Sequence, residues 1–173
     1  MSLMNGLELV KNNQLRSIPS FDIGGGNIDF IRASFEAAEL VKSPIFLSST
    51  PSTIKGYLGY KKYVHIIKMI AKDYQSNYAI HLDHAQKVED VLEALNSGFT
   101  SVMYDGSHSS FEENVRNTLI VKSHANHYNA SVEAEIGIIG GKEDEIEANN
   151  SSIPNINDIL KNIISFFIFT PFC

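Results

Sequence analysis

The chain has 173 residues, of which 43% are hydrophobic and 20% charged, and its formal net charge is −6 at pH 7. These values are typical of a single globular domain, and an acidic chain without a basic cluster is a poor match for a nucleic-acid surface. The N-terminus lacks the apolar core of a signal peptide, and the most apolar run, residues 163–169, is far shorter than the roughly 20 residues of a membrane span. A single cysteine, Cys173, cannot form an internal disulfide. We therefore expect a cytoplasmic protein without nucleic-acid or membrane partners.

Strand-like and helix-like segments alternate along the chain. The predicted strands are residues 17–23, 44–49, 78–83, 101–106 and 131–137. Each of the first four is followed by apolar residues at the three- and four-residue spacings of an amphipathic helix, and residues 155–164 predict a fifth helix. Ser110 and Glu113 match a capping box at the start of the fourth helix, and Gly98 is placed to end the third. This order predicts a parallel sheet with right-handed crossovers.

Two folds fit this alternation, an open doubly wound sheet and a (β/α)8 barrel. A complete barrel typically needs about 250 residues, so the length alone favours the open sheet. The periodicity of the segments does not decide between the two folds, and the placement of polar residues has to.

Polar side chains gather where the predicted strands end. They are Asp22, the hydroxyls up to Thr50, Asp83 with His84, Asp105, and Glu135. In parallel α/β folds the carboxyl ends of the strands carry the active site. Carboxylates and an imidazole converging there predict a metal site or an acid–base site. Glu133 lies on the same strand face as Glu135, and buried carboxylates require a cation or hydrogen-bond donors.

Simpler interpretations exist for each of these residues. Asp83 also fits a helix N-cap, His84 a surface loop, and Asp105 before Gly106 an ordinary turn. His81 shares a strand face with Asp83, and we interpret it as a supporting or structural residue. The loop at residues 140–144 reads either as a solvated loop or as a mobile lid that carries a base, Glu143.

Several motifs in order resemble one known family. They are SPIFLSST at 43–50, HLDH at 81–84, YDGSH at 104–108, FEEN at 111–114 and SVEAEIGIIGGKED at 131–144. Together they resemble the class II, metal-dependent ketose-bisphosphate aldolases over roughly residues 15–145. The resemblance implies a (β/α)8 TIM-barrel fold, here incomplete, with about five βα units in a single partial domain over residues 1–173.

The resemblance also implies a reaction and its cofactor. Members are zinc-dependent lyases of carbohydrate metabolism and glycolysis that reversibly cleave a ketose bisphosphate to dihydroxyacetone phosphate and an aldehyde. Such enzymes are cytoplasmic homo-oligomers. No Schiff-base lysine is needed, and no lysine stands at a predicted strand end.

Residue roles follow from the matched motifs. The resemblance makes His84 a zinc ligand, and it places Asp105 and Glu135 near the metal. It makes Asp83 the residue that exchanges a proton with the aldehyde oxygen, and Glu143 the base that acts on dihydroxyacetone phosphate. Thr50 and Asp22 line the substrate site, although the family usually has asparagine at the position of Asp22.

The end of the sequence departs from the family pattern. The chain stops before two further zinc histidines, a Gly-rich phosphate site and an Asn-x-Asp motif, and residues 165–173 match no family motif. Three hypotheses follow: an aldolase polypeptide that lacks the last part of its barrel, an inactive truncated barrel that acts as a structural or self-associating fragment, and another metal-dependent barrel enzyme such as a hydrolase.

Overall fold

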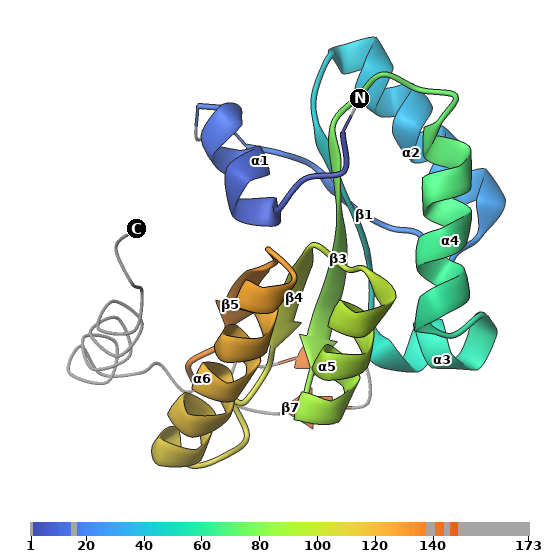
Figure 1. The fold of residues 1–173 in the computed structure, drawn as a ribbon. Helices are drawn as coiled ribbons and strands as arrows, with labels where there is room; N and C mark the ends of the chain where they lie inside the picture. The colour runs from blue at the N-terminus through green and yellow to red at the C-terminus, as the bar shows by residue number, and fades with distance from the viewer. Residues whose placement is uncertain (1, 15–16, 138–140, 144–145, 149–173) are drawn as a thin grey trace.

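A computed structural model describes residues 2–14, 17–137, 141–143 and 146–148 of the chain. The helix expected at 155–164 and the atypical tail at 165–173 lie outside the described residues. The centre of the described part is a five-stranded sheet in which every neighbouring pair is parallel and the order follows the chain, β1-β2-β3-β4-β5 (Figure 1).

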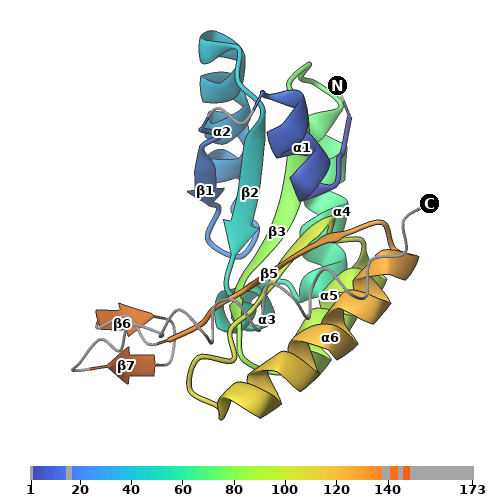
Figure 2. The ribbon, with the colours of Figure 1, turned by 90° about the vertical axis from the view of Figure 1, so that its left-hand side faces the viewer.

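Thirteen helices and strands make up the described part. The sheet consists of β1 (Ser20–Asp22), β2 (Ile45–Ser49), β3 (Tyr78–Ala85), β4 (Ser101–Tyr104) and β5 (Ser131–Ala134). The helices are α1 (Gly6–Asn12), α2 (Ile28–Val41), α3 (Pro51–Tyr57), α4 (Tyr60–Ala71), α5 (Val88–Ser97) and α6 (Phe111–His127). A separate antiparallel pair consists of β6 (Gly141–Glu143) and β7 (Ile146–Ala148) (Figure 2).

The predicted strands and the helices that follow the first four strands are confirmed in order and type. The Ser110 hydroxyl accepts the backbone N–H of Glu113, as the capping box predicts, and Gly98 ends α5 with a φ of 102°. Two helices were not predicted, α1 and α3. Each has only seven residues, too few for an apolar period to stand out from the sequence.

The hydrophobic core lies between the sheet and the helices that follow its strands. Helices α2, α4, α5 and α6 contact one another in that order and line one face of the sheet. Strand side chains that point to this face are fully buried, among them Leu47, Ile80 and Val102. Phe35 of α2 stacks on Tyr74 with 5.0 Å between ring centroids. These apolar contacts fix the positions at which the strands end.

The opposite face of the sheet carries a polar row. Register pairs Asp22 with Ser48, Ser48 with His81, His81 with Ser101, and Ser101 with Ser131. Residues paired in this way on parallel strands point to the same side of the sheet. A curved parallel sheet with its helices on one face and α1 against the other is part of a TIM-barrel-type fold, with five βα units and fewer strands than a closed barrel.

Within the part of the chain that the structure describes, no helix is both long enough and apolar enough to span a bilayer. The segment around Glu143, for which the sequence left a solvated loop and a mobile lid open, contributes β6 to the antiparallel pair with β7. The sequence pattern did not indicate these two short strands.

Candidate metal centre

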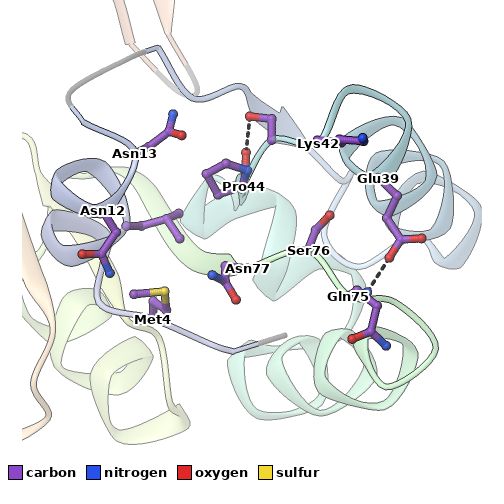
Figure 3. Close-up of a pocket in the computed structure, with 11 residues that line it drawn as sticks. Met4, Asn12, Asn13, Glu39, Lys42, Pro44, Gln75, Ser76 and Asn77 are labelled. Atoms are coloured by element: carbon purple, nitrogen blue, oxygen red, sulfur yellow. Dashed lines mark hydrogen bonds between the residues drawn. The ribbon is translucent and has the colours of Figure 1, made fainter.

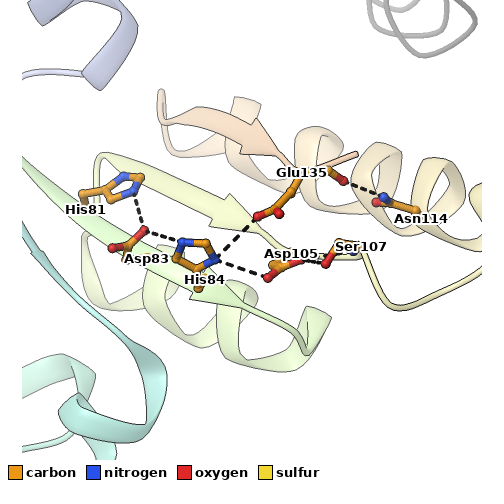
Figure 4. A network of polar contacts seen from close by, with 7 residues as sticks. All are labelled: His81, Asp83, His84, Asp105, Ser107, Asn114 and Glu135. Atoms are coloured by element: carbon orange, nitrogen blue, oxygen red, sulfur yellow. Dashed lines mark hydrogen bonds and ion pairs between the residues drawn. The ribbon is translucent and has the colours of Figure 1, made fainter. Parts of the chain in front are cut away.

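The site begins with an irregularity at the end of β3. The pairing of β3 with β4 shifts register between Leu82 and Ala85, and His84 inside this bulge has a φ of 45°. A non-glycine residue in the left-handed region carries strain, and bulges of this kind often re-aim a side chain next to an active site. Here the bulge turns the His84 ring toward the ends of β4 and β5 (Figure 4). His84 therefore belongs to the strand end and not to a surface loop, and the simpler interpretation of it is wrong.

Three side chains from successive strand ends converge. His84 Nδ1 lies 3.2 Å from Asp105 Oδ2 and 3.7 Å from Glu135 Oε2. The two carboxylates are only 5% and 12% exposed, so neither is an ordinary surface charge. The structure therefore brings together the imidazole and both carboxylates that the sequence singled out as metal-site residues (Figure 4).

Polar residues support the Asp105 carboxylate and the backbone of Glu135. Asp105 Oδ1 accepts the backbone N–H and the hydroxyl of Ser107, at 3.0 and 2.6 Å. Burial opposes ionisation of Asp105, but the hydrogen bonds from His84 and Ser107 outweigh it and lower its pKa to about 2. Asp105 is thus both a turn residue and a site residue. The Asn114 amide donates to the backbone carbonyl of Glu135 at 2.8 Å and fixes that strand end.

Asp83 lies beside this cluster, on the side of His84 away from the carboxylates. Its Oδ1 is 3.8 Å from His81 Nε2 and 3.9 Å from His84 Nε2. Its polar contact with His81 lowers its pKa; burial opposes that effect, and the charges of both histidines and the His84 backbone N–H reinforce it. Helix α5 is capped at Lys87, so Asp83 is not its N-cap and that simpler interpretation is wrong.

The remaining predicted site residues are not members of the cluster. Asp22, at the end of β1, accepts hydrogen bonds from Gly24 N–H and the Ser49 hydroxyl, both at 2.9 Å. Thr50 precedes α3, and its hydroxyl is 3.0 Å from that of Thr53. The backbone of Glu143 lies in β6, whereas its side chain is outside what the structure describes.

Sequence reasoning gave no role to several residues around the site. Ser107 and Asn114 lie inside motifs quoted for the resemblance, yet their type alone does not distinguish a supporting donor from a surface residue. Tyr63 was interpreted as part of an apolar helix stripe. Its buried hydroxyl has no hydrogen-bond partner among the described residues, and burial together with the charges of Asp22 and Asp83 raises its pKa. The residue spacing within one helix or strand carries no information about contacts with other parts of the chain, so it could not have revealed these contacts.

The donor set suits a divalent cation. His84, Asp105 and Glu135 each offer one ligand atom, and these atoms lie within 4.8 Å of one another. One imidazole nitrogen and two carboxylate oxygens are ligands that zinc and related divalent metals accept. A hollow of about 530 Å³ lies elsewhere, at the amino-terminal ends of β2 and β3, and its lining includes Asn12, Lys42 and Asn77 (Figure 3). It does not contain the cluster's residues, and the chemistry of the cluster defines the site.

Fold and site together define a protein of the (β/α)-barrel class with a cluster at the carboxyl ends of its strands that could hold a metal ion. The family model for class II fructose-bisphosphate aldolase matches residues 9–165. The chain belongs to this family.

Individual relatives agree with this assignment. The chain is 40% identical over 151 residues to the fructose-bisphosphate aldolase of Geobacillus stearothermophilus, covering 84% of this chain and 52% of that protein. It is 39% identical over 130 residues to the D-tagatose-1,6-bisphosphate aldolase subunit GatY of Klebsiella oxytoca, covering 75% of this chain and 45% of that protein. The chain therefore spans about half the length of these curated relatives.

Solved structures share the fold. A Coccidioides immitis protein assigned as a fructose-1,6-biphosphate aldolase superposes with a TM-score of 0.74 at 26% identity, over 94% of this chain and 57% of that one. The YdjI aldolase of Escherichia coli K12 gives a TM-score of 0.67 at 25% identity, over 78% of this chain and 51% of that one.

Proposed function

We propose that the chain carries part of the catalytic site of a zinc-dependent aldolase. Such an enzyme reversibly cleaves a ketose bisphosphate to dihydroxyacetone phosphate and an aldehyde. The convergence of His84, Asp105 and Glu135 from three successive strand ends supports this most directly. Membership of a metal-dependent family and similarity to a fructose- and a tagatose-bisphosphate aldolase support the reaction type.

His84 is proposed as a zinc ligand, with Asp105 and Glu135 supplying oxygen donors or orienting the ion. Zinc at this position would act as a Lewis acid on the ketone oxygen of the substrate. The two largely shielded carboxylates would give the cluster a negative charge when ionised, which favours a divalent cation over a monovalent one. The imidazole favours zinc and other transition metals over magnesium or calcium, and the family resemblance favours zinc among them.

Asp83 is proposed as the acid–base group that moves a proton at the aldehyde oxygen. It is 36% exposed beside His84, so a substrate can reach it, and its lowered pKa keeps it ionised, the form that can take up a proton. Glu143 is proposed as the base toward dihydroxyacetone phosphate. Thr50 and Asp22 are proposed to line the substrate site, where Asp22 Oδ1 is already held by Gly24 and Ser49.

The proposal also concerns setting and assembly. We place the protein in the cytoplasm, in carbohydrate metabolism and glycolysis, as a homo-oligomer without nucleic-acid or membrane partners. The family resemblance and the absence of a basic cluster support these assignments.

An assay with fructose and tagatose bisphosphates tests the reaction. Release of dihydroxyacetone phosphate can be followed through its NADH-dependent reduction by an added dehydrogenase. We expect cleavage that stops with a chelator and returns with zinc. Stoichiometric zinc without cleavage would instead favour a binding fragment, and hydrolysis of phosphate esters or amides would favour the hydrolase hypothesis. Cleavage that resists the chelator would refute the metal assignment.

A further inference from the structure

The polar row formed by Ser48, His81, Ser101 and Ser131 lies on the interior face of the barrel, where such residues are unusual. Such interiors are normally filled by bulky apolar side chains in layers. Here Ser48, His81, Ser101 and Ser131 occupy one layer, and Ser101 is fully buried while His81 is only 6% exposed. Buried polar groups persist where hydrogen bonds satisfy them, so the contacts within this row show what it can do.

Two hydrogen bonds connect Ser131, Ser101 and His81, and the donor in the bond to His81 depends on the tautomer of that ring. The Ser131 hydroxyl donates to Ser101 Oγ at 3.1 Å, and Ser101 Oγ lies 2.8 Å from His81 Nδ1. Ser131 donates to Ser101 and does not take its proton, so the single Ser101 proton remains available for His81 Nδ1. When Nδ1 accepts that proton in a hydrogen bond, a neutral His81 ring bears its own proton on Nε2. That nitrogen faces Asp83 Oδ1 at 3.8 Å (Figure 4).

Neighbouring groups hold the row in place. The edge of the Phe46 ring meets the His81 ring with 6.0 Å between centroids and an interplanar angle of 83°. Gly6 of α1 lies directly against the serines, since a Cβ there would come within 2.6 Å of Ser131 Oγ and 2.8 Å of Ser101 Oγ. A larger residue at Gly6 would displace both hydroxyls and would also meet Ser101 Cβ at 2.9 Å, so α1 or the strands would have to shift as well. Helix α1 thus closes the row from the side away from the metal centre.

We propose that Ser131 and Ser101 fix the Nε2-protonated tautomer of His81, and that His81 is thereby a positioning residue that orients the Asp83 carboxylate. The inference rests on the proposed function only for what Asp83 does, not for the state of His81. Hydrogen bonds of catalytic groups are commonly long without substrate and shorten in the complex. We therefore expect the 3.8 Å separation between His81 Nε2 and Asp83 Oδ1 to shorten when the site binds its substrate.

The tautomer of His81 can be measured without any catalysis. In the ¹⁵N-histidine-labelled chain, the His81 signals are assigned as those lost in His81→Gln, and the spectra are recorded in slightly alkaline buffer. We expect Nε2 to give the signal of a protonated nitrogen and Nδ1 that of an acceptor. Ser101→Ala should mix the two tautomers. Gly6→Ala should do the same without altering any member of the row, because it displaces both hydroxyls.

Ser48→Ala is the matched control. Ser48 is a buried serine on β2, which pairs with β3 on the side away from Ser101. Among the described residues, no hydrogen bond joins Ser48 to the His81 ring. Its replacement should leave the tautomer unchanged. A wild-type His81 protonated on Nδ1 overturns the proposal, as does a tautomer that Ser101→Ala leaves unaltered.

Kinetics test the positioning of Asp83. His81→Phe keeps a ring against Phe46 but has no donor, and should lower kcat about 10- to 100-fold with KM and bound zinc unchanged, as for other partners that orient a functional group. His81→Gln retains an N–H donor near the Nε2 position and should recover most of that loss. Equal losses in both variants, or loss of zinc from His81→Phe, would overturn the positioning role. If the wild-type chain lacks aldolase activity, the proposed function fails. The tautomer measurement then decides alone whether Ser131 and Ser101 fix the tautomer of His81.

Discussion

Replacing Asp105 by asparagine removes one negative charge from the candidate metal centre with little change in volume. The pKa of Asp105 falls from 3.8 to about 2 in the folded protein. At about 1.4 kcal/mol per unit, this shift corresponds to about 2 kcal/mol of unfolding free energy at neutral pH. The Asp105 side chain is only 5% exposed, so solvent screens this contribution weakly.

The pH dependence follows from the sign of the shift. Because the folded-state pKa lies below the unfolded-state value, the stabilisation is fully present above about pH 4 and disappears as the pH falls toward 2. Urea unfolding of the metal-free chain at several pH values measures it. We expect Asp105→Asn to lose about 2 kcal/mol near pH 7 and progressively less below pH 4.

A control separates this effect from the general loss of a charge. Glu93→Gln removes an exposed carboxylate from α5 and should change the stability little at any pH. If the difference between wild type and Asp105→Asn were independent of pH, the inferred contacts of Asp105 with His84 and Ser107 would not be the cause of its lowered pKa.

Three further changes test other parts of the account. Asp83→Ala should lower kcat about 10²- to 10⁴-fold in the coupled aldolase assay while bound zinc, measured by elemental analysis, stays the same; wild-type turnover would exclude its acid–base role. Ser110→Ala should cost about 1 kcal/mol in thermal unfolding because the N-cap of α6 is lost, and an unchanged midpoint would contradict the cap. Lys42→Gly should raise the free energy of unfolding by about 0.5–1 kcal/mol, because Lys42 ends α2 with a φ of 54°, which glycine adopts without strain. A destabilised variant would show that backbone strain at Lys42 does not determine the change in stability.

The sequence predicted the strand order because apolar periodicity is a local property. Strands β1 to β5 and the helices after the first four appear where the pattern indicated them. The polar residues at their ends converge because parallel strands finish at the same edge of the sheet. His84, Asp105 and Glu135 could therefore be named before any contact was known.

The supporting contacts could not be predicted in the same way. The bulge in β3 that re-aims His84 depends on the register with β4, which no single segment encodes. Ser101 and Ser131 are ordinary small strand residues until the pairing places them beside His81. Short helices such as α1 leave too weak a pattern, although α1 supplies the glycine that closes the row.

The family resemblance supplied what local patterns lacked. Periodicity alone left an open sheet and a barrel equally possible, and motif order decided between them. The match over residues 9–165 and the similarity to solved aldolases confirm that decision. The roles of Asp22, Thr50 and Glu143 remain predictions from the resemblance, and substitutions at these positions in the aldolase assay are their direct test.

Anomalous X-ray scattering at the zinc edge tests the central claim most directly. Crystals of the chain grown with zinc should show a peak bonded to His84, Asp105 and Glu135, at about 2.0–2.2 Å from their nitrogen and oxygen atoms. Asp105→Ala should weaken that peak, and Glu93→Gln should leave it unchanged. A zinc ion bound instead at the surface histidines of α6, His124 and His127, with none among the three strand-end residues, would contradict the proposed metal centre.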